Sequence, residues 1–178
     1  MSTAGWPALD GRIGTRFAPL DFGEPLVIQF PAGLPGFERC RRFVLIVSHE
    51  LAPLSCLQAI DPPEASFVAV DPTLLVPDYD FTLRELERRR LGASETEKLL
   101  WLALVTFSEH GATANLRAPI VINPNRMVGC QFIREEGDHP VHKGELYDVI
   151  RAANASAADG PATAVKLVER LRKRVEEP

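Results

Sequence analysis

The sequence predicts a mainly β protein: a single-domain antiparallel β-barrel or roll with one short inserted helix and a helical C-terminal extension. Short segments rich in apolar, β-branched and aromatic residues recur about every ten residues, with proline turns between them. This rhythm favours an antiparallel barrel or sandwich over a βαβ fold. The length of 178 residues, with 46% hydrophobic and 25% charged residues, indicates one soluble globular domain plus a tail.

Five strands are expected in the first 70 residues. They are Arg12 to Phe17, Leu26 to Phe30, Phe43 to Val47, Leu54 to Ile60 and Ser66 to Val70. The first alternates apolar with small or polar residues, which is the period of a half-buried strand. Asp61-Pro62-Pro63 and Asp71-Pro72 supply turns, because proline has no N–H to donate to a sheet.

One helix is expected to interrupt this pattern. Thr82-Leu83-Arg84-Glu85 matches a capping box, in which Thr82 caps the first turn and Glu85 reaches back to it. Gly92 is a natural C-terminal stop. The residues expected to pack inward are Leu83, Leu86 and Leu91. Those expected to face water are Arg84, Glu87, Arg88, Arg89 and Arg90.

The strongest apolar run, Leu99 to Phe107, reads as a central strand. A buried helix is the competing interpretation, and the β-branched and aromatic end of the run favours the strand. Three more strands are expected to complete the sheet, with the turn Asn123-Pro124-Asn125 before the last of them. They are Ala112 to Arg117, Ile120 to Ile122 and Val128 to Ile133.

The chain changes character beyond Gly137, so we expect a barrel domain over residues 1–140 and a helical extension over residues 141–178. Glu145 to Ala153 is a weakly amphipathic helix and Thr163 to Val175 a stronger one. The net charge is −4. The last helix is basic and the body before it is acidic, so the two could pair, although a solvated helix face is the simpler interpretation.

The segment from Phe30 to Phe37 is the most distinctive loop. Pro35-Gly36 suits the two central positions of a type II turn, and Gly33 supplies a second permissive backbone point. Phe30 and Phe37 can place both rings in one core and hold the ends of the loop together. Two interpretations stay open: a rigid connection between strands, which the loop alone favours, or a shaped surface that a partner recognises.

Several functional classes are disfavoured. No apolar run approaches the roughly 20 residues of a membrane helix, and the N-terminus lacks the pattern of a signal peptide, so a cytoplasmic location is expected. Cys40, Cys56 and Cys130 are odd in number and none forms a C-x-x-C pair, so reduced thiols are expected rather than disulfides or zinc. The negative net charge argues against direct nucleic-acid binding.

Catalytic signatures are also lacking. The sequence has no G-x-S-x-G, P-loop or H-E-x-x-H motif. His139 and His142 flank a proline beside Asp138, and we expect surface histidines rather than a metal site; Glu135-Glu136 is expected to face solvent. No nucleophile, base and orienting group come together. We therefore expect a binding protein with no cofactor, no metal and no enzyme activity.

Eight segments between about Thr15 and Phe132 occur in the order typical of one protein family. They are Thr15-Arg16-Phe17, Phe30 to Glu38, Phe43-Val44-Leu45, Leu57 to Pro62, Phe67 to Pro72, Pro77 to Phe81, Asn115 to Asn123 and Gly129-Cys130-Gln131. F-P-x-G-x-P-G-F and L-x-A-P-I-V-I-N are together highly specific. The chain thus resembles the FliW flagellar assembly factors. It departs from them at Ala18-Pro19, where a glycine is usual, and in its tail beyond residue 140.

The resemblance implies a compact antiparallel β-barrel without catalytic activity and with two protein partners. One is flagellin, which FliW holds in the cytoplasm before export. The other is CsrA, an RNA-binding protein that represses translation of the flagellin message and that free FliW antagonises. If one partner excludes the other, the flagellin concentration sets how much protein remains for CsrA. Flagellin's terminal segments are expected to bind as amphipathic helices, and the acidic body would suit a basic partner surface.

We hypothesise that two loops make these contacts. The first contributes Gly33, Pro35, Gly36, Phe37 and Glu38. The second contributes Pro77, Asp78, Tyr79, Asp80 and Phe81. The second loop mixes apolar and aromatic residues with two acids, a composition suited to an interface with a polar rim. The alternative places Tyr79 and Phe81 in the core and leaves Asp80 merely preceding the helix.

Two other functions stay open from the sequence. One is a β-barrel that binds a small molecule, or an enzyme, which a deep pocket lined by polar groups would support and a filled interior would count against. The other is an RNA-binding regulator that uses the arginine-rich helices, for which salt-sensitive RNA binding would be the sign.

Overall fold

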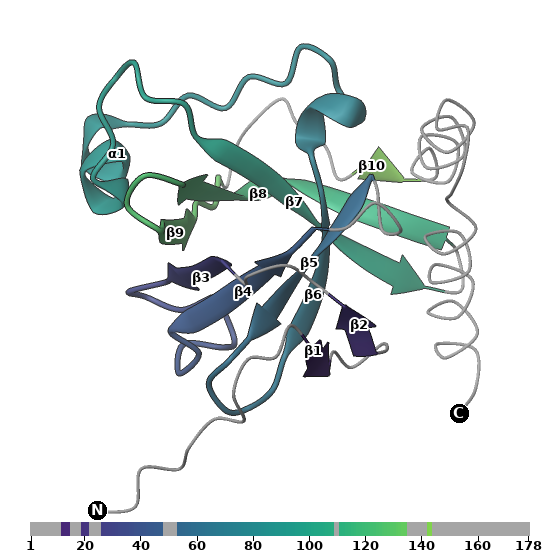
Figure 1. Cartoon of the computed structure of the whole chain (residues 1–178). Helices are drawn as coiled ribbons and strands as arrows, with labels where there is room; N and C mark the ends of the chain where they lie inside the picture. The colour runs from purple at the N-terminus through teal and green to yellow at the C-terminus, as the bar shows by residue number, and fades with distance from the viewer. Residues whose placement is uncertain are drawn as a thin grey trace, which may run out of the picture.

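Seven strands close into a barrel, as the sequence predicts (Figure 1). The computed structural model describes residues 12–14, 19–21, 26–47, 53–108, 111–134 and 142–143. The barrel strands are β3 (Leu26–Gln29), β4 (Arg42–Ile46), β5 (Leu54–Ala59), β6 (Ser66–Val70), β7 (Leu100–Ser108), β8 (Gly111–Asn123) and β9 (Val128–Gln131). Neighbouring strands are antiparallel, except that β3 and β9 pair in parallel at Gln29 and Val128 to close the ring.

Three further strands lie beside this ring. β10 (His142–Lys143) pairs with the first half of β8, and β1 (Arg12–Gly14) pairs with β2 (Pro19–Asp21) in a separate ribbon. The sequence did not predict β2, which begins with a proline. Some of the predicted features lie outside the described residues. These are the second half of the first predicted strand, both helices of the predicted extension, and His139 with Glu135-Glu136.

The predicted strands Ala112 to Arg117 and Ile120 to Ile122 are one continuous strand, β8, with an irregularity between them. The register against β7 shifts between Leu102 and Leu104. A bulge of this kind turns the following residues to the other face of a sheet. Ile120 accordingly packs inside the barrel, whereas Leu116 packs outside it in a second cluster, which we call the outer cluster. The outer cluster contains Leu54, Val68, Val70, Leu75, Ala103, Val105, Ala112, Ala114 and Leu116. Pro119, which has no N–H, is tolerated at this break in the ladder.

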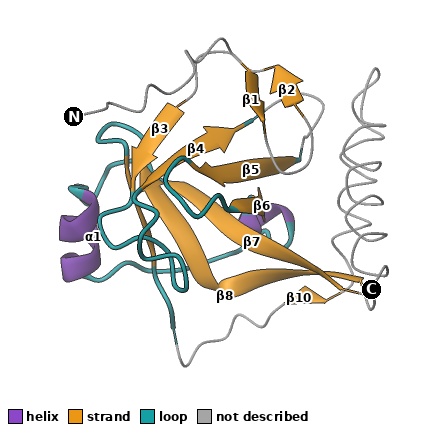
Figure 2. Ribbon diagram, turned by 90° about the horizontal axis from the view of Figure 1, so that it is seen from below, coloured by secondary structure: helices purple, strands orange, loops and turns teal. Residues whose placement is uncertain are grey.

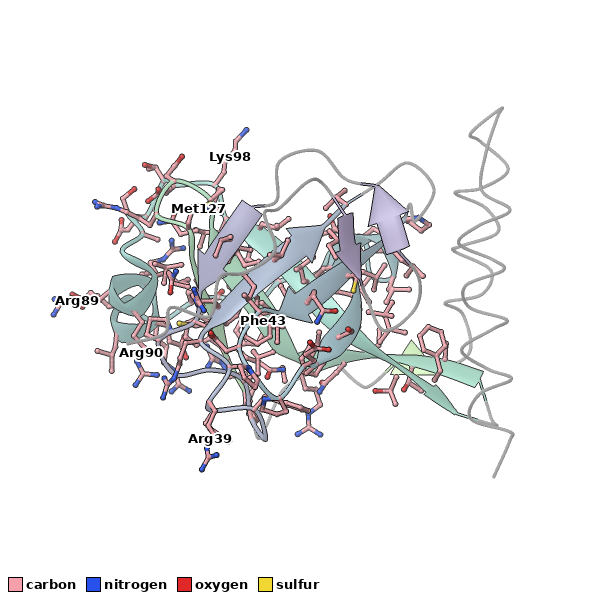
Figure 3. All side chains as sticks on the ribbon, turned by 60° about the horizontal axis from the view of Figure 1, so that its bottom comes forward. Arg39, Phe43, Arg89, Arg90, Lys98 and Met127 are labelled. Carbon is pink, nitrogen blue, oxygen red and sulfur yellow. The ribbon has the colours of Figure 1, made fainter. Side chains whose placement is uncertain are left out.

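The barrel interior is filled by aromatic and aliphatic side chains. Phe30 and Phe43 are fully buried and meet edge to face with ring centroids 4.8 Å apart. Figure 3 shows Phe43 among the side chains at the centre of the barrel. The inner cluster contains Ile28, Phe30, Leu34, Cys40, Phe43, Leu45, Leu57, Ala59, Ala65, Ala69, Leu102, Ile120 and Ile122. Burial of this set supplies the main driving force for folding.

The connection from β6 to β7 covers the outer face of the sheet. It contains the 3-10 helix η1 (Pro72–Leu74) and the helix α1 (Glu85–Leu91). Its apolar residues pack on side chains of β6, β7 and β8 that point away from the interior, such as Val70, Val105 and Val121. Figures 1 and 2 place α1 at one end of the described barrel and the paired ends of β7 and β8, at Ser108 and Gly111, at the other.

The start of α1 and its inward face differ from the prediction. The helix begins at Glu85 rather than after Thr82, and the carboxylate that reaches back is that of Glu87, which accepts the N–H of Arg84 at 2.8 Å. Leu86, expected inside, is 63% exposed, whereas Glu87, expected in water, is buried. Leu83 precedes the helix, so Glu87 and Leu91, four residues apart, define its inward side. Gly92 ends the helix at a φ of 60°, as predicted.

Candidate functional site

The first candidate loop contains the predicted type II turn. The N–H of Phe37 donates to the carbonyl of Leu34 at 2.7 Å, with Pro35 and Gly36 between them and a φ of 82° at Gly36. Gly33 also has positive φ, at 67°, and its N–H donates to the carbonyl of Phe30 at 2.9 Å. Both glycines therefore hold conformations that other residues rarely adopt.

Aromatic packing fixes this loop to the barrel. Phe30 is fully buried, and the Phe37 ring meets the edge of Phe67 with centroids 5.1 Å apart. Phe30 belongs to the inner cluster and Phe37 packs against it, so both rings serve one core, as the sequence predicts. Gly33 is buried as well, so the exposed ones among the five candidate residues of this loop are Pro35, Gly36 and Glu38.

Glu38 orders the exposed tip of the loop. Its Oε1 accepts the N–H of Gly36 at 2.9 Å. This backbone hydrogen bond, and a second from its own N–H, lower the pKa of the Glu38 carboxyl, and the nearby charge of Arg41 lowers it further. The loop therefore presents a proline and an ionised, oriented carboxylate.

The second candidate loop is anchored by its aromatic residues. Tyr79 donates its hydroxyl to the carbonyl of Leu116 at 2.9 Å and stacks on Phe81, which is 9% exposed. Burial raises the pKa of the Tyr79 hydroxyl to about 12. Phe81 and Tyr79 therefore serve the core, as the alternative interpretation supposed. Pro77, Asp78 and Asp80 are the exposed residues that a partner could reach.

An arginine that the sequence did not single out clamps this loop to the barrel. The guanidinium of Arg134 donates to both carboxylate oxygens of Glu87, at 2.6 and 2.7 Å, and to the carbonyl of Thr82 at 3.2 Å. It also lies over the Phe81 ring, 4.5 Å from the centroid. The two charged residues are 47 positions apart, so no local spacing signals the pair.

We predict that replacing Glu87 by glutamine weakens the fold at neutral pH but much less in acid. Hydrogen bonds from Arg134 hold the pKa of Glu87 below its ordinary value of 4.5, so the ion pair stabilises the folded state above that value. The contribution is lost as the pH falls through the lower, folded-state pKa. Urea unfolding should show a cost of about 2 kcal/mol at pH 7, because one charged partner stays largely buried.

The same comparison at successively lower pH should show the two proteins converging below pH 4.5. A constant difference across that range would mean that Glu87 stabilises the fold by shape rather than by charge. Exposed Glu85 offers a matched control, since its ion pair with Arg89 is largely in water and its replacement by glutamine should cost little at any pH.

The two loops rest on different parts of the core. The first packs through Leu34 and Phe37 against the inner cluster. The second packs through Tyr79 against the outer cluster, and through Tyr79 and Phe81 in a third cluster with Leu91. They are therefore supported independently, and damage to one need not disturb the other.

The local charge of the second loop is acidic, although the described barrel as a whole is not. The described residues include thirteen Lys or Arg and eleven Asp or Glu, so the acidic excess of the chain lies outside them. Residues 71–83 nevertheless contain three aspartates and no basic residue. The predicted attraction for a basic partner thus rests on this loop rather than on an acidic body.

The described part of the chain contains three free cysteines and no cluster of metal ligands. No three His, Cys, Asp or Glu side chains there are grouped as metal ligands, and none of its helices is long and apolar enough to span a bilayer. The three cysteines are free, as the sequence predicts, and burial raises the pKa of Cys56 to about 12. That thiol is therefore a packed apolar group rather than a nucleophile.

Comparison with known proteins identifies the family. A sequence model of the FliW protein family matches residues 13–144. The flagellar assembly factor FliW of Geotalea uraniireducens is 40% identical over 123 residues, covering 68% of this chain and 75% of that protein. That of Natranaerobius thermophilus is 32% identical over 127 residues, covering 70% and 84%.

A solved structure agrees. The crystal structure of a flagellar assembly factor FliW superposes with a TM-score of 0.64 at 29% identity, covering 74% of this chain and 94% of that one. Both candidate loops lie inside the matched region. The chain therefore belongs to the FliW family of flagellar assembly factors.

Proposed function

We propose that this FliW family member binds flagellin in the cytoplasm and antagonises the translational regulator CsrA, so that flagellin synthesis follows export. The observation that carries the proposal is the family match over residues 13–144, which spans the whole barrel and both loops. In this scheme the protein acts by occupying macromolecules, and it transforms no substrate.

The packing of the barrel supports a binding role at the surface. Its interior is occupied by side chains such as Phe30, Phe43 and Leu57, none of which is exposed at all. A small-molecule site of the usual kind needs an interior cavity lined by a few polar groups. A filled interior counts against that alternative and leaves the loops as the surfaces offered to partners.

The chemistry of the second loop suggests which kind of partner surface it binds. Asp78 and Asp80 stand exposed beside the apolar Val76 and Pro77, which is the mixture of an interface with a polar rim. This loop suits a basic surface such as that of an RNA-binding regulator. Because Tyr79 and Phe81 fix its backbone, binding there requires little ordering of the loop.

We predict that the double charge reversal Asp78→Lys and Asp80→Lys weakens CsrA binding by about tenfold or more. Two attractive contacts at the rim become repulsive, which mainly lowers the association rate. Each tenfold loss of affinity corresponds to about 1.4 kcal/mol of binding free energy. Calorimetric titration of CsrA into the purified protein measures the effect. Urea unfolding of the variant checks that the barrel remains folded.

A matched control distinguishes a direct contact of the second loop from an effect of the net charge of the protein. Glu64 and Glu95 are exposed, and replacing both by lysine changes the net charge by the same amount away from the second loop. Their replacement should leave CsrA affinity nearly unchanged. Equal losses in the two variants, or no loss in the Asp78 and Asp80 variant, would remove the second loop as the contact.

A further inference from the structure

The outer face of β7 is covered at one end and left partly open at the other. Alternate residues of β7 point outward, and these are Trp101, Ala103, Val105 and Phe107. The Tyr79 ring meets the edge of Trp101 with centroids 6.5 Å apart, and η1 packs on β7. Phe107, the last of the row, is only half-buried. The end of β7 that pairs with the start of β8 therefore presents apolar surface.

Two residues of the connection from β6 to β7 extend this apolar surface. Leu74 of η1 is 44% exposed, and Val76 is half-buried against the same outer cluster as Phe107. We call Leu74, Val76 and Phe107 the hairpin face. Its rim is acidic, because Asp71 and Asp78 are exposed and no basic residue occurs among residues 71–83. An apolar centre with an acidic rim suits a basic amphipathic segment.

The chain leaves this part of the described structure at the edge of the hairpin face. β10 lies along β8, with Lys143 opposite Thr113, and Thr113 is opposite Thr106 of β7 (Figure 2). β10 runs toward the next row of the sheet, in which Ala112 pairs with Phe107. The rest of the chain therefore starts beside the hairpin face.

One segment in the rest of the chain matches this face in both its apolar and its charged groups. The sequence predicts an amphipathic helix from Thr163 to Val175, outside the described residues. An isolated helix of this length is marginal in water, so it needs an apolar surface to pack on. Residues 166–178 have a net charge of +2, from five basic and three acidic residues. The apolar side of the predicted helix consists of Ala164, Leu167, Val168, Leu171 and Val175.

We propose that residues 163–175 fold back as a helix onto the hairpin face of their own chain. The apolar side of the helix packs on Phe107, and its basic side chains pair with Asp71 and Asp78 at the rim. The tether through residues 144–162 favours this occupant over a second copy of the protein, because a short linker gives an effective concentration of about 1 mM.

The docked helix covers the second loop and so competes with CsrA. This consequence rests on the proposed function, in which Asp78 contacts CsrA. The match to the FliW family ends at residue 144, so the competition is a property that the extension adds to the barrel.

Photo-cross-linking of the full chain tests the docking without any partner. A benzophenone amino acid in place of Leu171 should cross-link to the hairpin face within one chain, which mass spectrometry of the digested protein identifies. The same probe in place of Lys173, on the opposite side of the predicted helix, is the matched control and should not cross-link there. The docking is overturned by cross-links from position 171 to another part of the barrel or to a second chain, by equal yields from the two positions, or by no cross-links at all.

Two substitutions on the barrel test the two halves of the recognition. Leu74→Asn removes the exposed apolar side chain of η1, and Asp78→Lys reverses a charge at the rim. Each should lower the yield of the cross-link from position 171 severalfold. Glu64→Lys makes the same charge change at an exposed position away from the second loop and should leave the yield unchanged. Unchanged yields in all three variants would contradict the proposed contact.

Calorimetric titration of CsrA tests the competition. The double variant Leu167→Asn with Leu171→Asn should release the helix and raise the affinity for CsrA about tenfold, which corresponds to a second loop that is open about a tenth of the time in the wild type. Unchanged affinity would overturn the competition. If CsrA bound neither protein, the proposed function would fail, while the cross-links would still decide the docking.

Discussion

Replacing Gly33 by alanine is expected to destabilise the protein by about 3 kcal/mol or more, one of the two largest effects that we predict. An alanine at φ 67° costs about 1–2 kcal/mol for the left-handed conformation alone. Its β-carbon would also lie 2.7 Å from both the Cα of Glu38 and the carbonyl oxygen of Phe37. Backbone atoms cannot swing aside, so the whole turn must shift. Urea unfolding measures the loss.

Gly36 is the matched control within the same loop. It has the same kind of conformation, at φ 82°, but a β-carbon there would meet nothing within 4 Å. Its replacement by alanine should cost only the conformational part, about 1–2 kcal/mol. Equal stabilities of the two variants would show that a β-carbon at position 33 does not collide with the backbone of the loop.

Replacing Gly129 by alanine is expected to cost about 2–3 kcal/mol by overpacking the core. The added β-carbon would lie 2.8 Å from Cε1 and Cε2 of Phe30 and closer still to Cζ. The ring has no room to retreat, because Phe30 is fully buried and its other side meets Phe43. Gly129 lets β9 approach β3 where the two strands close the barrel.

A smaller side chain at position 30 should partly rescue this variant. Phe30→Leu alone leaves a void and destabilises the protein, but it removes the ring atoms that collide with the new β-carbon. The double variant should therefore be more stable than the sum of the two single losses predicts, by about 1 kcal/mol. Additive losses in urea unfolding would show that Gly129 and Phe30 do not press on each other.

Features that depend on neighbouring residues were predictable from the sequence. The apolar run from Leu99 to Phe107 forms β7, Pro35-Gly36 forms the type II turn, and Gly92 stops α1. Each follows from the conformational limits of the residues themselves. The strand β2 was missed because a three-residue segment beginning with a proline carries almost no periodic signal.

Features that depend on distant partners were not predictable. Glu87 reads as a solvent-facing acid, and only the fold brings Arg134 to it from 47 residues away. The inward turn of Glu87 then leaves Leu86 exposed at the surface. A buried ion pair between residues distant in the sequence depends on the tertiary structure, so helix periodicity cannot predict it.

The candidate site shows the same division. The sequence predicts both loops and their turn residues, but it leaves Tyr79 and Phe81 divided between interface and core. The hydroxyl bond to Leu116 and the clamp of Arg134 over Phe81 give these rings a structural role. The proposed contact with a partner therefore rests on the exposed carboxylates of Asp78 and Asp80.

Competition between the two proposed partners tests the central claim most directly. The protein is saturated with flagellin, and CsrA is then titrated into the complex by calorimetry, with the flagellin-free protein measured alongside. We expect CsrA to bind the free protein and to lose its apparent affinity in proportion to the flagellin present, as mutual exclusion requires. Undiminished CsrA binding to the saturated complex, or no binding of either protein, would contradict the account.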